Sequence, residues 1–374
     1  MIKILHLADL HLGRSHGYLG ERAAARMREA DTVLQRAADY VVHERPDVEG
    51  VVIAGDVFES YRPADSLVGG VIGVLRGLVE AGKTVITLPG NHDELSYADC
   101  VYWKHRERWP GALVTSPGWA KVATVETADG PCHFYGIAYQ AGLTPDALDP
   151  SIPLETDGLH VAVLHASVGL PGKDRAIQST WEDLGKLRTD YVALGHVHKP
   201  DQRSLLKGVA VYPGLVEGSG FDDPGCGELV VASLSGGSVE VERIPFGARR
   251  IHTEAIDLGD FDDPGGVTER IRALSDPDLI LRVRLGGTAG FDASASVLAG
   301  ELAGGFHHLE VEDDSTPMGA ADVEAAAGEE TVLGRVIRDL REREAKAGTD
   351  AERAAARRAI RHVWEAFRGG GACG

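Results

Sequence analysis

The sequence predicts an α/β protein of two or three domains, and three observations carry that prediction. Over residues 1–245, short apolar runs of strand length alternate with longer stretches of helical periodicity. Residues 251–314 repeat this alternation on a smaller scale, whereas residues 320–368 show helical periodicity without a strand signal. A chain of 374 residues is long enough for this number of packed domains.

The first part of the chain contains the longest series of expected strands. Each run is short and rich in Val, Ile and Leu, as buried strands are. The expected strands are 2–7, 50–54, 84–88, 159–164, 191–194, 209–212, 228–234 and 239–244. The expected helices between them are 21–44, 64–81 and 97–108.

The remainder of the chain predicts two smaller units. A strand-helix-strand-helix-strand pattern runs through 253–257, 267–274, 279–285, 293–302 and 308–311. After it, two apolar stripes at helical spacing flank Gly348 and Thr349, which predicts a helical hairpin. The first stripe is Val332, Leu333, Val336, Ile337 and Leu340, and the second is Ala359, Ile360, Val363, Trp364 and Phe367. The expected domains are therefore 1–248, 249–318 and 319–374.

Composition narrows the classes of protein. The net charge of −19 opposes loose binding to nucleic acid or to anionic membranes through bulk charge, so any such contact must be local or assisted. The four cysteines, Cys100, Cys132, Cys226 and Cys373, form no CxxC pair, which argues against a zinc ribbon or a disulfide framework. We find no targeting or membrane segment, and we expect a cytoplasmic protein.

Polar motifs follow five of the expected strands. The side chains that they supply are Asp9, His11, Asp56, Asn91, His92, Asp93, His165, His196 and His198. The carboxyl ends of strands meet at one edge of an open α/β sheet, so we expect these side chains to converge. Carboxylates, an amide and imidazoles without thiolates suit a pair of divalent metal ions, and Asp56 is the natural bridging carboxylate.

Asn91 is the only asparagine in the chain. Its side-chain oxygen is a hard but neutral ligand, so it coordinates a cation without neutralising it. An aspartate there would remove part of the positive charge that binds a phosphate ester. Any one of the motifs alone would most often be a turn, a helix cap or a buried core histidine. Their joint occurrence at strand ends favours a functional site.

The order DLH, GDVFE, GNHD, LHASV and GHVH resembles the calcineurin-like metallophosphoesterases. The segments ADLHLGR, GDVFESYRPADS, YVALGHVHKP and VYPGLVEGSGFDDPGCGELVV resemble, more specifically, the SbcD/YhaO-type DNA repair exonucleases. This resemblance covers residues 1 to about 245 and continues more weakly into 251–314. It implies two mixed β-sheets sandwiched between helices, a small α/β capping domain and the C-terminal helical hairpin.

The resemblance also implies roles for the polar residues. One metal would be held by Asp9, His11, Asp56 and His198, and the other by Asp56, Asn91, His165 and His196. His92 would act on the phosphate, with Asp93 orienting it, and the two ions would be Mn²⁺, with Mg²⁺, Fe²⁺ or Zn²⁺ as alternatives. We expect hydrolysis of a phosphodiester by metal-bound hydroxide. Two departures from the family are Glu59, where Asp or His is frequent, and Ala166, where Gly is usual.

The expected function is a DNA nuclease, the nuclease subunit of a repair complex with an SbcC-like or YhaN-like ATPase of the SMC type. The hairpin, residues 330–368, would dock to that ATPase, although it could instead pack on its own catalytic domain. A homodimer stays open. The alternatives are a small-molecule or cyclic-nucleotide phosphodiesterase and a non-catalytic metal-binding scaffold. Basic residues expected near the site are Arg14, Arg62, Lys173, Arg175, Lys199 and Arg203.

Overall fold

The computed structural model describes residues 1–170, 175–289, 291, 293–317 and 320–369. The chain divides into two compact units, Met1–Arg250 and Ile251–Gly374. The expected three-domain division, with a boundary near residue 319, stays a prediction. Among the described residues, no helix is both long and apolar enough to cross a membrane. Cys100, Cys132 and Cys226 are free thiols, and Cys373 lies outside the described residues.

The first unit contains two mixed sheets. The first sheet has the order β13-β12-β1-β2-β3-β4, in which β1 to β4 are parallel and β12 and β13 are antiparallel. The bounds are β1 Ile2–Leu7, β2 Gly50–Ala54, β3 Thr84–Leu88, β4 Ala112–Leu113, β12 Glu228–Ser235 and β13 Ser238–Pro245. In the second sheet, β10-β11-β9-β7-β6-β5, the four inner strands are parallel, and β8 pairs with β7. Its bounds are β5 Ala120–Thr127, β6 Gly130–Ile137, β7 Leu159–Val168, β8 Ile177–Ser179, β9 Tyr191–Gly195, β10 Asp201–Ser204 and β11 Val209–Tyr212.

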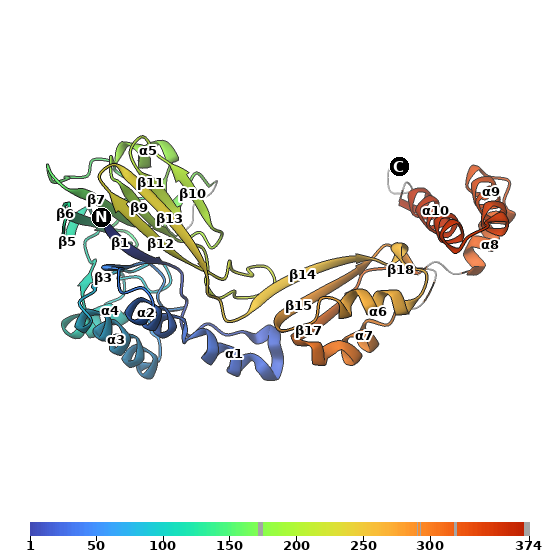
Figure 1. Ribbon diagram of the computed structural model, residues 1–374, viewed down its shortest axis with the longest axis horizontal. Helices are drawn as coiled ribbons and strands as arrows, with labels where there is room; N and C mark the ends of the chain where they lie inside the picture. Colours follow the sequence, from blue (N-terminus) through green and yellow to red (C-terminus); the bar gives the residue numbers. More distant parts are fainter. Residues whose placement is uncertain (171–174, 290, 292, 318–319, 370–374) are drawn as a thin grey trace. The chain divides into compact units, whose positions relative to one another are not determined.

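The two sheets face each other across the main core. Val52 of β2 belongs to the same buried apolar cluster as Phe134 of β6 and Val161 of β7. Figure 1 shows α2 and α3 on one side of the strands and α5 on the other. The helices of this unit are α1 Ala23–Ala30, α2 Val33–His43, α3 Asp65–Glu80, α4 Val101–His105 and α5 Trp181–Lys186. The expected sandwich of two mixed sheets flanked by helices is confirmed.

Some elements of the first unit differ from expectation. The expected helix 21–44 is interrupted between α1 and α2, where the Thr32 hydroxyl donates to the Glu29 carbonyl and the Asp31 carboxylate accepts from Gly13 N. Such local side-chain bonds compete with helix continuation. The hairpin β5–β6 was not expected, because β5 alternates between half-buried and exposed positions and lacks a continuous apolar run.

The second unit begins with a small α/β domain. Its sheet has the order β14-β15-β17, formed by Arg250–Asp257, Asp276–Gly286 and Phe306–Asp313. Helices α6, Pro264–Arg272, and α7, Ala295–Leu302, share a buried apolar core with this sheet. The short strands β16, Thr288–Ala289, and β18, Thr316–Pro317, pair with each other.

The C-terminal helices are α8 Ala320–Gly328, α9 Val332–Lys346 and α10 Asp350–Gly369. The hairpin of α9 and α10 encloses a core with α8 that includes Ile337, Ile360 and Trp364. Two large side chains of the expected apolar stripes are exposed, Val332 at 69% and Phe367 at 50%, and neither belongs to that core.

Candidate metal centre

The predicted ligands come together from both sheets of the first unit. Asp9 and His11 follow β1, Asp56 follows β2 and Asn91 follows β3, all from the first sheet. The second sheet supplies the three remaining histidines, which are His165 within the last part of β7 and His196 and His198 directly after β9. Strand β7 is therefore longer than its apolar run indicates.

Asp56 lies between two groups of these side chains. Its Oδ2 atom is 3.4 Å from Nε2 of His165 and 3.7 Å from Nε2 of His11. Its Oδ1 atom accepts a hydrogen bond of 2.8 Å from the backbone N–H of His92. One oxygen thus faces imidazoles on two sides, which is the position that a carboxylate shared by two cations requires.

On the His11 side, the donors are imidazoles and Asp9. The Nε2 atoms of His11 and His198 lie 3.2 Å apart. Ligand atoms of Asp9, His11 and His198 all lie within 4.8 Å of one another. Both oxygens of Asp9 also accept from the backbone N–H of His196, at 3.0 and 3.1 Å, which joins the loop after β1 to the loop after β9.

On the His165 side, Asn91 is central. Its Oδ1 atom lies 2.9 Å from Nε2 of His165 and 3.0 Å from Nδ1 of His196. The Nδ1 atom of His165 lies 3.0 Å from the carbonyl oxygen of Ala54, which can only accept, so Nδ1 carries the proton and Nε2 faces the centre. The neutral amide oxygen and two imidazole nitrogens therefore surround one point.

The backbone at four of the seven predicted ligands adopts left-handed conformations. Among the described residues, five that are not glycine have positive φ: Asp9, His11, Asp56, His196 and Arg188. Four of these five are predicted ligands. Such conformations cost about 1–3 kcal/mol each and concentrate at functional sites. The strained backbone conformations thus occur at residues whose side chains are also suited to bind a metal ion.

Two glycines make room for these side chains. A Cβ atom on Gly55 would lie 2.0 Å from Nδ1 of His165, and one on Gly90 would lie 2.1 Å from Oδ1 of Asp56. Real Cβ contacts are longer than this. The glycines of the GD and GN pairs are therefore needed so that the ligand side chains can pack against the neighbouring loops.

The electrostatics of the centre favour positive charge. Burial opposes ionisation of Asp56, but the imidazoles of His165, His11 and His92 outweigh it and hold the Asp56 pKa below its usual value. Burial likewise opposes protonation of His165, yet the carboxylates of Asp56 and Asp9 raise the His165 pKa to about 9. A group of donors that draws a proton onto a fully buried imidazole also suits a divalent cation, so the residues present fit the expected metal ions.

Asp93 is hydrogen-bonded to the backbone and to a tyrosine near His92. The Asp93 oxygens accept from the backbone N–H groups of Gly90 and Phe58 and from the hydroxyl of Tyr102. Burial, followed by the charge of Asp56, raises the Asp93 pKa to about 6. Asp93 thus holds the shape of the loop that carries His92, and it does not contact the imidazole. The expected role of Asp93 in orienting His92 stays a prediction, and these three hydrogen bonds would exert it through the loop backbone.

The imidazole of His92 is contacted by Glu59. Its Nδ1 atom lies 3.1 Å from the Glu59 backbone oxygen and 3.9 Å from Oε1 of the same residue. The other carboxylate oxygen of Glu59 lies 3.0 Å from Nδ1 of His11 and accepts from Arg14 at 2.7 Å. Glu59 therefore contacts the site directly, which the sequence left open between a solvated turn acid and a supporting role.

Asp223 is a site residue that the sequence reasoning missed. Its Oδ2 atom lies 2.6 Å from Nδ1 of His198 and accepts from the Ser219 hydroxyl at 3.1 Å. The only sequence signal is its place in the segment GSGFDDPGCG, which follows the ligands by about 25 residues. Of the expected basic residues, Arg14 adjoins the centre, while Arg175 pairs with Glu94 and Lys173 lies outside the described residues.

Comparison with known proteins places this geometry in a family. Residues 2–236 match the profile of the calcineurin-like phosphoesterase superfamily domain. The metallophosphoesterase YhaO of Bacillus subtilis is 27% identical over 64% of this chain and 59% of its own length. The DNA double-strand break repair protein Mre11 of Aeropyrum pernix is 28% identical over 70% of this chain and 64% of its own. The SbcD component of the nuclease SbcCD of Bacillus subtilis is 24% identical over 61% and 65%, respectively.

These alignments span less than two thirds of the length of each relative. The family profile, by contrast, covers well over half of this chain and includes β1 to β12, from which every predicted ligand comes. The chain therefore belongs to the calcineurin-like phosphoesterase superfamily, a family of metal-dependent phosphoesterases.

Proposed function

We propose that this protein is a DNA nuclease that hydrolyses phosphodiesters with two divalent metal ions. The observation that carries the proposal is the position of Asp56 Oδ2 between the imidazoles of His165 and His11. A carboxylate so placed suits ions about 3.5–4 Å apart, as in two-metal phosphoesterases. DNA is favoured as substrate because two of the relatives are named as a DNA repair protein and a nuclease.

The proposed ligands follow the two groups of side chains. Asp9, His11 and His198 would hold one ion, Asn91, His165 and His196 the other, and Asp56 both. When bound, the ions would act as Lewis acids towards the phosphate and lower the pKa of water from about 15.7 towards about 7. Manganese is the ion that we propose, because a mixed Asp, Asn and His donor set suits it, although such sets discriminate weakly among divalent metals.

His92 is the proposed proton donor to the leaving oxygen. Its Nδ1 atom faces the Glu59 carbonyl oxygen, so Nδ1 carries a proton and Nε2 is the nitrogen left to face a substrate. The Glu59 carboxylate lies 3.9 Å from the same Nδ1 atom, on the side of the ring away from the substrate-facing nitrogen. The hydrogen bond from His92 N to Asp56 fixes the backbone of this residue against the centre.

The experiment that tests the function compares DNA with two small phosphate esters. Linear duplex and single-stranded DNA, bis-p-nitrophenyl phosphate and a 2′,3′-cyclic nucleotide are incubated with the protein and Mn²⁺. We expect DNA cleavage that disappears in His92→Ala. Hydrolysis of the small esters without cleavage of DNA would move the assignment to a small-molecule phosphodiesterase. Metal binding without any hydrolysis would favour the scaffold role.

We also propose that residues 330–368 bind an SMC-type ATPase of the SbcC or YhaN kind. Val332 and Phe367 are large apolar side chains that are exposed and lie outside the core formed with α8, so they are available for such a contact. We expect Val332→Asp combined with Phe367→Asp to abolish co-purification with a co-expressed ATPase of this type. Unchanged co-purification of the double variant would contradict this assignment.

A further inference from the structure

Two tyrosines from the loops of the metal centre stack on each other. Tyr61 lies in the loop after β2, and Tyr97 lies in the loop after β3. Their ring centroids are 4.1 Å apart and their planes differ by 18°. Tyr61 is partly buried against the main core, whereas Tyr97 is 42% exposed. The pair therefore presents an aromatic ring to solvent on a support that is anchored in the fold.

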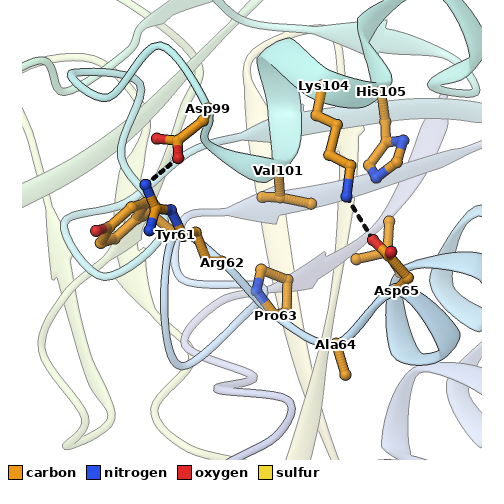
Figure 2. Close-up of a pocket in the computed structure, with 10 residues that line it drawn as sticks. Tyr61, Arg62, Pro63, Ala64, Asp65, Asp99, Val101, Lys104 and His105 are labelled. Carbon is orange, nitrogen blue, oxygen red and sulfur yellow. Dashed lines mark hydrogen bonds and ion pairs between the residues drawn. The ribbon is translucent and has the colours of Figure 1, made fainter.

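The stack is held in place on the Tyr61 side. The guanidinium of Arg62 lies over the Tyr61 ring, 5.2 Å from its centroid, and pairs with Asp99. Tyr61, Arg62 and Asp99 are among the residues that line a cavity of about 480 Å³, and Figure 2 shows their side chains. The backbone N–H of Val101 donates to the Tyr61 carbonyl at 2.9 Å. Tyr61 is thus fixed by contacts on several sides, which limits the rotamer entropy that a ligand would have to overcome.

Short stretches of chain connect the stack to the centre. Tyr61 follows Glu59 by two residues, and the Glu59 carboxylate lies 3.0 Å from Nδ1 of His11. Tyr97 follows His92 by five residues. A second cavity, of about 540 Å³, is lined by both Glu59 and Arg62. Five residues span at most roughly 18 Å even when fully extended, so Tyr97 lies within the reach of a nucleic-acid strand whose phosphate is at the centre.

The charges around the stack argue for aromatic rather than ionic recognition. Arg62 is paired with Asp99, and Lys104 is paired with Asp65. Each cation is balanced by an adjacent carboxylate, and the whole chain has a net charge of −19. Such a surface gains little from contact with phosphates alone. Stacking on an aromatic ring needs no net charge and accepts any base, because every base has a π-face.

We propose that the exposed ring of Tyr97 is a stacking platform for an unpaired nucleobase of single-stranded nucleic acid bound at the metal centre. The inference rests on the proposed function, since it assumes a nucleic-acid substrate. Bases inside a duplex are stacked on one another, so the platform selects single strands, frayed ends or flaps. It would hold the strand through a base while the ions and His92 act on the phosphate.

The test measures binding separately from cleavage. A short fluorescein-labelled poly-dT strand and an abasic strand of the same length are titrated with protein in the His92→Ala background, and binding is followed by anisotropy. We expect poly-dT to bind more tightly than the abasic strand. Tyr97→Ala and Tyr97→Leu should weaken poly-dT binding roughly tenfold and bring the ratio of the two affinities towards one. Tyr97→Phe, which keeps the ring, should retain that ratio.

Two results would overturn the platform. One is equal affinity of the protein with Tyr97 intact for the poly-dT and abasic strands, and the other is an unchanged affinity ratio in both Tyr97→Ala and Tyr97→Leu. The proposed function fails differently. If the ratio changes as expected but the wild-type protein cleaves no DNA, the platform stands and the nuclease assignment does not.

Discussion

The carboxylate of Asp223 lies 2.6 Å from Nδ1 of His198, on the opposite side of the imidazole from the metal centre. An acceptor at Nδ1 fixes the tautomer in which Nε2 is free to bind a cation, and such partners support metal affinity. We therefore expect Asp223→Asn to reduce metal affinity or turnover about 10- to 100-fold. Calorimetric titration with Mn²⁺ measures the metal affinity, and hydrolysis of bis-p-nitrophenyl phosphate measures the turnover.

The neighbouring aspartate supplies a matched control for this substitution. Asp222 is exposed, and Asp222→Asn makes the same change of charge one residue away. If the two variants lose metal affinity equally, the effect comes from overall charge and not from the contact with His198.

Asn91→Asp tests whether a neutral ligand is required. The added charge would sit where Asn91 Oδ1 now lies, 2.9 Å from Nε2 of His165. It should strengthen metal binding but weaken attraction for the phosphate, so we expect kcat to fall on the order of a hundredfold while metal stays bound. Metal content after gel filtration and kcat on bis-p-nitrophenyl phosphate measure the two effects. Wild-type turnover in this variant would contradict the idea that position 91 requires a neutral ligand.

Asp56→Ala and His92→Ala should both abolish activity, but for different reasons. Asp56 is the proposed shared ligand, so its loss should release metal. His92 is a proposed proton donor, a role worth about 10²–10⁴ in rate, so its variant should keep metal content near the wild-type value. Elemental analysis of the purified variants distinguishes these outcomes. Unchanged turnover in His92→Ala would contradict its assigned role.

Arg26 is expected to be a major contributor to stability. Its side chain is fully buried and pairs with Glu217 at 2.6 Å and with Glu29 at 3.1 Å. Removing one member of a buried ion pair costs about 3–5 kcal/mol, because the partner charge stays buried. We expect Arg26→Ala to lower the free energy of unfolding by that amount in urea titrations. Arg28→Ala, on the exposed side of α1, should change it little.

Stability should also depend on pH through His6. Burial lowers the pKa of His6 to about 3, and its Nδ1 atom lies 2.9 Å from the hydroxyl of Tyr191. Between about pH 6.5 and this value, the unfolded chain binds a proton that the folded protein does not, so stability falls as pH falls. The His6 contribution to the free energy of unfolding is fully present above about pH 7.5. Below the unfolded-state pKa, this contribution falls by about 1.4 kcal/mol per pH unit.

The check on this prediction is a comparison of slopes. Urea titrations of the wild type and of His6→Gln between neutral and mildly acidic pH give the free energy of unfolding at each pH. The slope should be shallower in the variant by the amount stated, since glutamine does not titrate. Parallel slopes would mean that His6 does not retain its low pKa in the folded state.

The sequence predicted the strands of the first sheet better than the edges of the second. β1, β2 and β3 are buried on both faces, so their apolar runs have clear limits. β5 has an exposed face and no such run, and β10 is largely polar and was not expected. Apolar periodicity reports burial, and an edge strand with little burial gives little signal.

The candidate site shows a similar division. Residues such as Asp56 and Asn91 were found because they directly follow buried strands, and their convergence is a property of the fold class. Asp223 could not be found in this way, because its contact with His198 depends on how an irregular loop folds back. The contact of Asp93 with Tyr102 was not predicted for a related reason, since Tyr102, nine residues further along, reaches the carboxylate from another element.

The positive φ angles of Asp9, His11, Asp56 and His196 have a consequence for evolution and design. Glycine adopts these angles without strain. A glycine at any of the four positions would therefore remove the conformational cost that the present side chain imposes on the backbone. Selection for thermal stability alone would thus favour glycines at these positions of the DLH, GD and GHVH motifs. The resulting protein would be more stable but would lack the ligand side chains. Engineering for heat resistance should hold these four positions fixed, because there stability and chemistry demand opposite residues.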